Sequence, residues 1–171
     1  MPGNCIGRQQ YIITLVDDYS RFTMAKAIHM KSDAVEAVKD MLLYLESMAS
    51  TSAHTMKVAA LRTDYGGEFK SNEFRGWLHK PGIAERPTVP YYSQPNRIVE
   101  RANRWLVNII RTCLHTCPMS PWPHAIEHRI FTKNRLPHRA RPAYRSSIEV
   151  VSPSIYIQAE RERFRLFCQK V

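Results

Sequence analysis

The feature that most constrains the fold of this chain is a run of six residues, YIITLV at positions 11–16. β-branched, aliphatic and aromatic residues follow one another here, so a strand made from this run has no polar face. The run therefore predicts an interior strand of a sheet that is covered on both sides. The next residues, DDYS at positions 17–20, favour a turn, and residues 22–28 predict a second strand. Because the turn is so short, the two strands should pair as an antiparallel hairpin.

Helical patterns alternate with strands along the rest of the chain. Further strands are predicted at residues 58–61 and 83–84. Helices are predicted over residues 33–49, over residues 72–79, from residue 95 or 97 to residue 116, and between Pro121 and Pro137. Ser32 is placed to cap the first of these helices. Because strands alternate with helices, we expect an α/β domain with a mixed sheet.

Length and composition favour one domain with a tail. The chain has 171 residues, of which 44% are hydrophobic. Residues 1–137 are predicted to form the core domain, and residues 138–171 a basic, weakly structured extension with one strand at residues 164–171. The apolar runs are too short for a membrane span, and no secretory signal is visible at the start. Four irregularly spaced cysteines suit a reducing, intracellular compartment.

Positive charge is concentrated in the second part of the chain. Residues 1–70 carry eight Lys and Arg against eight Asp and Glu, whereas residues 71–171 carry seventeen against seven. The whole excess of +10 thus lies after residue 70. A basic half joined to a neutral half indicates a polyanionic partner that binds to one side of the molecule. The alternatives are a solvated basic surface and a basic tail.

Two carboxylates in different settings stand out. Asp64 follows the predicted strand at residues 58–61, and Glu100 lies near the start of the next long helix. An acid at the end of a strand and an acid in the first turn of a helix can converge on one metal ion. Along the helix, Glu100, Arg104 and Arg111 fall on nearly one line. This line is either a phosphate-binding row beside an acid, or an exposed Glu–Arg pair without a function.

Several short motifs occur in a fixed order. They are YIITLVDDYSR at residues 11–21, LRTDYGGEF at 61–69, VPY at 89–91, Asn96 with VERANR at 99–104, and NRLP at 134–137. In this order and spacing they resemble the integrase catalytic core of copia-like retrotransposons, within the ribonuclease-H-like superfamily. The resemblance implies a ribonuclease-H-like mixed sheet flanked by helices.

The resemblance also implies a chemistry, a site and partners. Integrases of this family join a DNA 3′ hydroxyl to a target phosphodiester, with two Mg²⁺ (or Mn²⁺) ions at the reaction centre. Hard cations take oxygen ligands, and the resemblance assigns Asp64 as the second metal-binding carboxylate and Glu100 as the third. DNA is the expected partner, in a homo-oligomer that needs no membrane and no small-molecule cofactor and works in the nucleus. The residues expected at the DNA are Asn96, Arg97, Arg101, Arg104 and Arg111.

The first carboxylate of the family has no counterpart in this sequence. The family carries it on a first strand, which lies in the middle of the sheet between the hairpin and the strand before Asp64. In register that position falls before Met1, and residues 1–10 contain no acid. We therefore expect a sheet without its central strand, or one in which residues 5–9 or the tail substitutes poorly. Asp17 matches a turn of the family and is a weak candidate for a replacement ligand.

Two further departures affect the same region. The family usually has Asn where Tyr65 stands and Gly where Arg97 stands, and a bulky cation at the second position should stiffen the loop before Glu100. Three functions remain open. The chain is an integrase core with an incomplete catalytic site, an active strand transferase or nuclease that recruits another acid, or a DNA-binding module that uses Arg101, Arg104 and Arg111.

Overall fold

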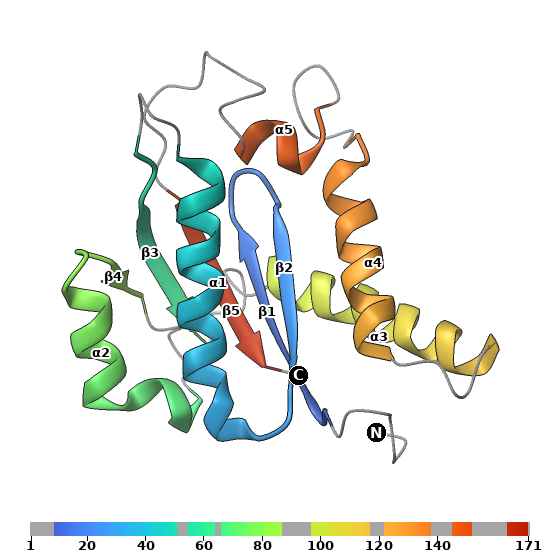
Figure 1. Cartoon of the computed structure of the whole chain (residues 1–171), viewed down its shortest axis with the longest axis horizontal. Coiled ribbons are helices and arrows are strands. Elements are labelled where there is room, and N and C mark those ends of the chain that lie inside the picture. Colours follow the sequence, from blue (N-terminus) through green and yellow to red (C-terminus); the bar gives the residue numbers. More distant parts are fainter. Residues whose placement is uncertain are drawn as a thin grey trace.

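A five-stranded mixed sheet lies at the centre of the molecule, with helices on both of its faces (Figure 1). The structure is a computed structural model, and it describes residues 9–50, 55–63, 66–86, 97–116, 122–137, 145–151 and 164–170. The strands are β1 (Tyr11–Asp17), β2 (Thr23–Ile28), β3 (Val58–Thr63), β4 (Ala84–Glu85) and β5 (Phe164–Lys170). They follow the order β2-β1-β5-β3-β4 across the sheet. The predicted α/β class with a mixed sheet is confirmed.

β1 and β2 form the predicted antiparallel hairpin, in which six residue pairs lie opposite one another. β1 is an interior strand, because β2 lies on one side of it and β5 on the other. Its side chains alternate between the two faces of the sheet. Ile13 and Leu15 belong to one core cluster, whereas Ile12 and Val16 belong to two clusters on the other face. The lack of a polar face in YIITLV is therefore explained by burial on both sides.

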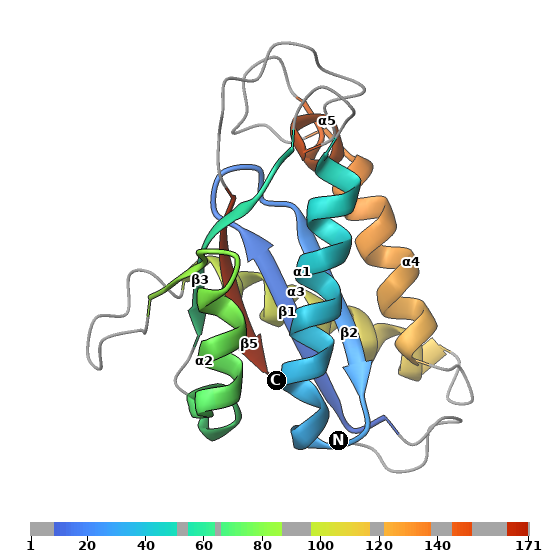
Figure 2. The same cartoon turned by 60° about the vertical axis from the view of Figure 1, so that its left-hand side comes forward.

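The place between β1 and β3 is taken by β5, which comes from the C-terminal part of the chain (Figures 1 and 2). β5 runs antiparallel to β1 and parallel to β3, so that Cys168 is level with Leu15 on one side and with Thr63 on the other. This is the place that the resemblance gives to the family's first strand. The sheet is thus not short of a strand, and the tail is the part of the chain that supplies the central one. The extension after residue 137 contributes directly to the core.

One face of the sheet is covered by α1 (Ala34–Ala49) and α2 (Asn72–His79), with the short 3₁₀ helix η2 (Gly67–Lys70) leading into α2 (Figure 1). α1 buries the apolar stripe that its sequence predicts, including Val38, Leu42 and Leu45. The rings of Phe69 and Phe74 join the same core cluster and are fully buried. Within the described part of the chain this is the largest cluster, and it holds the sheet and both helices together.

The other face is crossed by α3 (Arg97–Thr116), and α4 (Trp122–Arg135) packs against α3 and β2 (Figure 2). Two smaller clusters form here. Leu106 and Ile126 pack with Ile12, and the first turns of α3 pack with Val16. The helix predicted between residues 95 and 116 is therefore confirmed, and its N-terminal end is fixed on the end of β1.

The start of α1 differs from the sequence prediction. Ser32 does not cap the helix, because a 3₁₀ turn, η1 (Lys31–Asp33), precedes it. The Asp33 carboxylate instead accepts a hydrogen bond from the Met30 backbone N–H at 2.9 Å, and the Ser32 hydroxyl donates to the same carboxylate at 3.3 Å. The prediction of a Ser32 cap was wrong because two polar residues adjoin at this position and the second one closes the turn.

The last described helix, α5 (Ser147–Val151), begins with a reciprocal cap. The Glu149 carboxylate accepts hydrogen bonds from the Ser146 backbone N–H at 2.7 Å and from the Ser146 hydroxyl at 2.8 Å, and the Glu149 N–H donates to that hydroxyl. This is the Ser-x-x-Glu capping arrangement. The two hydrogen bonds from Ser146, the backbone one first, hold the pKa of Glu149 below its ordinary value, and Arg145 adds to the shift. Among the described residues, no helix combines the length and the apolarity that a membrane span requires.

Candidate nucleic-acid interface and carboxylate site

Glu100 lies in the first turn of α3, where the helix begins on the sheet. Val99 and Ala102, its neighbours along the helix, are buried against Val16 of β1, and this packing turns Glu100 outward into solvent. Among the described residues no ion pair joins Glu100 to Arg104, although the two are four residues apart. The exposed Glu100–Arg104 ion pair, which was the alternative to a functional row, is thus not formed. The Glu100 carboxylate faces solvent.

The second predicted ligand, Asp64, lies outside the described residues. β3 ends at Thr63, directly before it. Thr63 is buried and level with Cys168 of β5. The meeting of Asp64 and Glu100 around one cation therefore stays a prediction.

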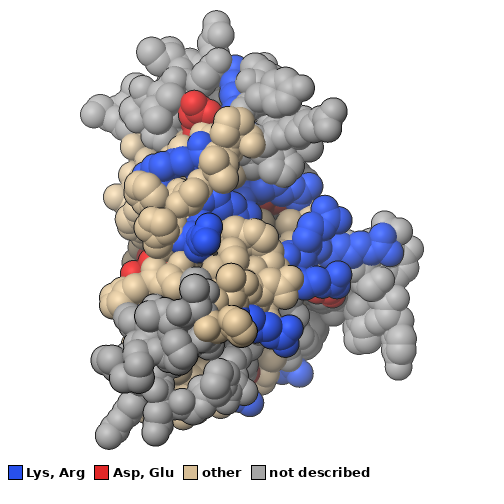
Figure 3. Space-filling model, turned by 90° about the vertical axis from the view of Figure 1, so that its right-hand side faces the viewer, with Lys and Arg blue, Asp and Glu red and all other residues tan. Residues whose placement is uncertain are grey.

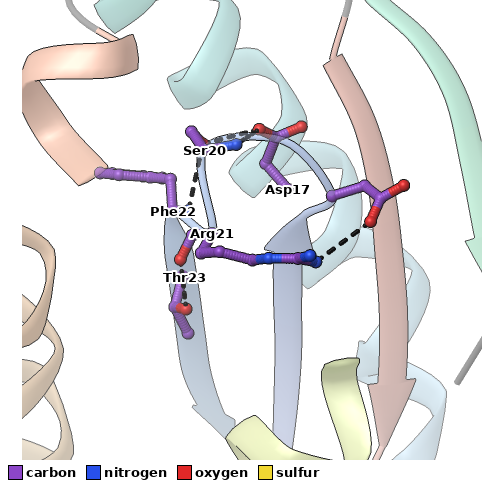
Figure 4. Close-up of polar contacts among 6 residues, drawn as sticks. Asp17, Ser20, Arg21, Phe22 and Thr23 are labelled. Carbon is purple, nitrogen blue, oxygen red and sulfur yellow. Dashed lines mark hydrogen bonds and ion pairs between the residues drawn. The ribbon is translucent and has the colours of Figure 1, made fainter. Parts of the chain in front are cut away.

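Asp17 does not provide a replacement ligand. Its side chain is 1% exposed, and its Oδ2 atom accepts hydrogen bonds from the Ser20 N–H at 2.7 Å and the Ser20 hydroxyl at 2.6 Å (Figure 4). The register places Asp17 level with Leu61, whereas Thr63 is level with Leu15. Asp17 is thus displaced from the end of β3 by two strand spacings, about 10 Å, and by about 7 Å along the strands. Its carboxylate closes the hairpin turn, which is the turn role that the sequence indicated.

The hairpin turn is held from outside by α4. Arg21 adopts a left-handed backbone conformation with φ of 56°, and its guanidinium pairs with Asp18 at 3.1 Å (Figure 4). Asn134 of α4 accepts from the Thr23 N–H at 3.0 Å and donates to the Thr23 carbonyl at 2.7 Å. Lys133 donates to the Thr23 hydroxyl and the Arg21 carbonyl. Since β2 is an edge strand, the Asn134 amide occupies the backbone groups that a further strand would use.

Basic side chains form a row along α3. Arg97, Arg101, Arg104 and Arg111, all predicted at the DNA, are exposed, and no ion pair with another described residue engages them. Asn96, the remaining predicted contact, lies outside the described residues. Asn108 and His115 are also exposed and were missed by the sequence prediction. Their signal is the spacing, because positions 97, 101, 104, 108, 111 and 115 alternate steps of four and three and so keep to one side of a helix. These six residues are called the α3 row.

The α3 row is part of a wider basic surface. Arg129 and Arg135 are exposed on α4, which packs against α3. Figure 3 shows this side of the molecule, where Lys and Arg side chains form a band and acidic side chains are few. α3 carries four arginines against one glutamate, and α4 carries three basic residues against one. The charge asymmetry predicted along the sequence is therefore also an asymmetry in space.

The described residues offer one ligand of the kind that Mg²⁺ takes at this place. They contain no group of three His, Cys, Asp or Glu side chains that could hold a metal ion. The solvent-facing carboxylate of Glu100 fits a hard cation in which water and phosphate oxygens complete the coordination. A full carboxylate cage is not formed by the described part of the chain.

Comparison with known proteins decides the family. The sequence profile of the integrase core domain matches residues 2–93, which is more than half of the chain. The chain belongs to the integrase core domain family. The retrovirus-related Pol polyprotein from transposon TNT 1-94 of Nicotiana tabacum is 30% identical over 134 residues, which cover 77% of this chain and 10% of that protein. The Gag-Pro-Pol polyprotein of human T-cell leukemia virus 2 is 32% identical over 76 residues, or 44% of this chain and 5% of that one. The chain thus spans a tenth or less of the length of these relatives.

Solved integrase structures share the fold. The HTLV-2 integrase catalytic core domain in complex with magnesium, in a trimeric form, superposes with a TM-score of 0.62 at 21% identity over 86% of this chain and 89% of that one. A simian T-cell lymphotropic virus intasome in complex with PP2A regulatory subunit B56 gamma gives a TM-score of 0.69 at 19% identity, over 91% of this chain and 54% of that chain. The ribonuclease-H-like fold expected from the motifs is therefore confirmed. The HTLV-2 core in that structure is itself a complex with magnesium.

Proposed function

We propose that this chain is an integrase core of the copia-like kind that binds retroelement DNA along α3 but does not itself complete the strand-transfer site. The observation that carries the proposal is the place of β5. This strand fills the position between β1 and β3, and its sequence FRLFCQK contains no Asp or Glu. The strand-transfer function of the family needs an acid on that central strand, as the resemblance implies.

The strand register sharpens this argument. Cys168 is level with Thr63, the residue before Asp64, and it is followed by Gln169 and Lys170. A central strand that delivered a carboxylate toward the end of β3 would carry it at these positions. They hold a thiol, an amide and an amine, none of which is a preferred ligand of Mg²⁺.

The proposed DNA-binding surface is the α3 row. From Arg97 to His115 the helix rises by about 27 Å, since each residue adds about 1.5 Å. This length matches about eight base-pair steps of B-form DNA. Arginines that are free of acidic partners can contact phosphates without first breaking an ion pair, and guanidinium groups bind phosphate oxygens in a bidentate manner. These contacts position a duplex without reading its sequence.

Glu100 stands beside this row. With DNA on Arg97, Arg101 and Arg104, the phosphodiester backbone would pass the Glu100 carboxylate, which would repel it unless a cation lay between them. A bound Mg²⁺ would supply that charge and polarise a phosphoryl oxygen. In this proposal Glu100 and Asp64 hold the ion, and the arginines hold the backbone in place. The tobacco polyprotein and the oligomeric core structures support DNA and further copies of the chain as partners.

A Mg²⁺-dependent strand-transfer assay on a retroelement end, run beside a DNA-binding measurement, tests the proposal. We expect salt-sensitive binding of duplex DNA and no transfer product above that of Glu100→Gln. Product that disappears in Glu100→Gln would show a complete site and overturn the catalytic part. DNA affinity that is unchanged in Arg101→Ala/Arg104→Ala would overturn the binding part.

A further inference from the structure

We propose that the place of β5 is a strand-binding slot that can also be filled from outside, by the C-terminal strand of a second copy of this chain. The inference concerns residues 164–170 and the two strands on either side of them. It does not depend on DNA binding or on the chemistry of Glu100.

β5 is paired through its backbone along both of its edges. It pairs with residues 13–17 of β1 on one side and with residues 58–63 of β3 on the other. These two strands are its main neighbours, and α3 also lies close to it. Ladder hydrogen bonds of this kind depend on an extended backbone and not on which molecule supplies it. The slot therefore selects a strand by register and direction.

The strands on both sides of the slot also have contacts that do not involve β5. β1 is fixed by β2 and by core side chains on both faces, and β3 is fixed by β4 and by the α1 cluster. All of these elements lie between residues 11 and 135, before β5 in the chain. Without an occupant, β1 and β3 would each leave a row of unpaired N–H and C=O groups in the middle of the sheet. The sheet is thus more stable with a fitting strand in the slot than with the slot empty.

The link to β5 is long enough for exchange. α5 ends at Val151 and β5 begins at Phe164, so twelve residues, 152–163, connect them. Twelve residues can span at most about 40 Å. A connection of that reach allows the strand to enter its own slot or that of a neighbouring molecule, and exchange of an identical element costs little because the contacts are the same. Its own slot is favoured at low protein concentration, because a tethered strand has an effective concentration on the order of millimolar.

Exchange would place a partner's strand at the candidate site. Cys168 is level with Thr63, directly before Asp64. A swapped dimer would therefore complete the sheet beside the second predicted carboxylate with residues of the other copy.

Strand complementation of the full chain tests the inference. Leu166→Pro disables the resident strand, because Leu166 pairs with Asp17 and Leu61 and proline is excluded from a central strand. A fluorescent peptide with the sequence of residues 162–171 is then titrated in reducing buffer, and its anisotropy and the thermal transition of the protein are measured. The control peptide has the same sequence with proline at position 166.

We expect saturable binding to the Leu166→Pro chain, at least tenfold weaker binding to the unaltered chain, and no binding of the proline peptide. The thermal transition of Leu166→Pro should rise with peptide, or reappear where that variant alone does not fold. Equal binding of both peptides, or failure of the peptide either to bind or to restore the transition, would overturn the inference. In parallel, light scattering of the unaltered chain refolded at high concentration should show a dimer that Leu166→Pro does not form.

Discussion

The two helical layers that cover the sheet have opposite characters. α1 and α2 bury the large aliphatic and aromatic cluster, and their charges are matched: Lys39 lies within 3.3 Å of Glu36, and Lys26 of β2 pairs with Asp40 of α1 at 2.7 Å. α3 and α4 bury two smaller clusters and present arginines that no described acidic residue neutralises. The first layer thus mainly stabilises the fold, whereas the second also carries the surface that we propose binds DNA.

A matched pair of core substitutions separates the two layers by their contribution to stability. Leu45 on α1 and Leu106 on α3 are both fully buried. We expect Leu45→Ala to lower the free energy of unfolding by about 3–4 kcal/mol and Leu106→Ala to lower it by about 2–3 kcal/mol. The loss is larger for Leu45→Ala because its cavity opens in the larger of the two clusters. Urea denaturation measures both values. A larger loss from Leu106→Ala would contradict the assignment of the α1 layer as the main core.

The second prediction concerns the charged surface. Arg101→Ala/Arg104→Ala/Arg111→Ala should weaken duplex DNA binding by about 10²-fold at low salt and reduce the slope of log affinity against log salt by about 2 to 3. The control removes the same charge elsewhere, with Lys31→Ala/Lys57→Ala/Lys80→Ala, three exposed lysines that lie outside α3 and α4. Fluorescence anisotropy at several salt concentrations gives both quantities. Equal losses in the two triple variants would mean that net charge, and not the α3 row, binds DNA.

The third prediction tests how α4 holds the hairpin. Asn134 is buried and bonds both backbone groups of Thr23. Asn134→Ala should lower the free energy of unfolding by about 2 kcal/mol, because two hydrogen bonds are lost at a buried position. Asn108→Ala, the same substitution at an exposed position of the α3 row, should change it by less than about 0.5 kcal/mol. Similar losses in the two variants would show that the Thr23 contact adds nothing.

The smallest expected effect is a pH dependence at α5. Since the pKa of Glu149 is held below its ordinary value by Ser146, the ionised carboxylate stabilises the folded chain above the ordinary pKa, and this contribution disappears as the pH falls through the folded-state pKa. Glu149→Gln should therefore lower the urea midpoint slightly at pH 7, and the difference should vanish in acid. Glu127→Gln on α4 is the control. A Glu149→Gln difference that grows in acid would contradict the cap.

Local sequence signals predicted most of the elements. The YIITLV run gave the hairpin and its interior strand, and proline and glycine at residues 81–82 bounded α2 at the predicted residues. The predicted Ser32 cap was wrong because the turn orients the adjacent Asp33 side chain, and not that of Ser32, toward the free backbone N–H. The place of β5 was not predictable from its own sequence, because the pairing of residues 164–170 with β1 is set by a slot about 150 residues away in the chain.

The candidate site was predicted only in part. Glu100 and the arginines of α3 were found because a helix has a regular period, and Asn108 and His115 could have been found by extending the same period. Whether Asp64 joins Glu100 depends on how the chain continues after β3, which no periodic pattern describes. The motifs left open whether residues 5–9, the tail or no segment fills the place between β1 and β3, and only the structure shows that residues 164–170 do.

The position of β5 underlies both the proposed function and the strand-binding slot, and nuclear Overhauser contacts in the isotope-labelled chain test it most directly. The structure predicts backbone contacts from Cys168 to Leu15 on one side and to Thr63 on the other, with slowly exchanging amides through residues 165–169. Contacts between β1 and β3 themselves, or a strand at residues 164–170 that exchanges as fast as an unstructured peptide, would contradict the account.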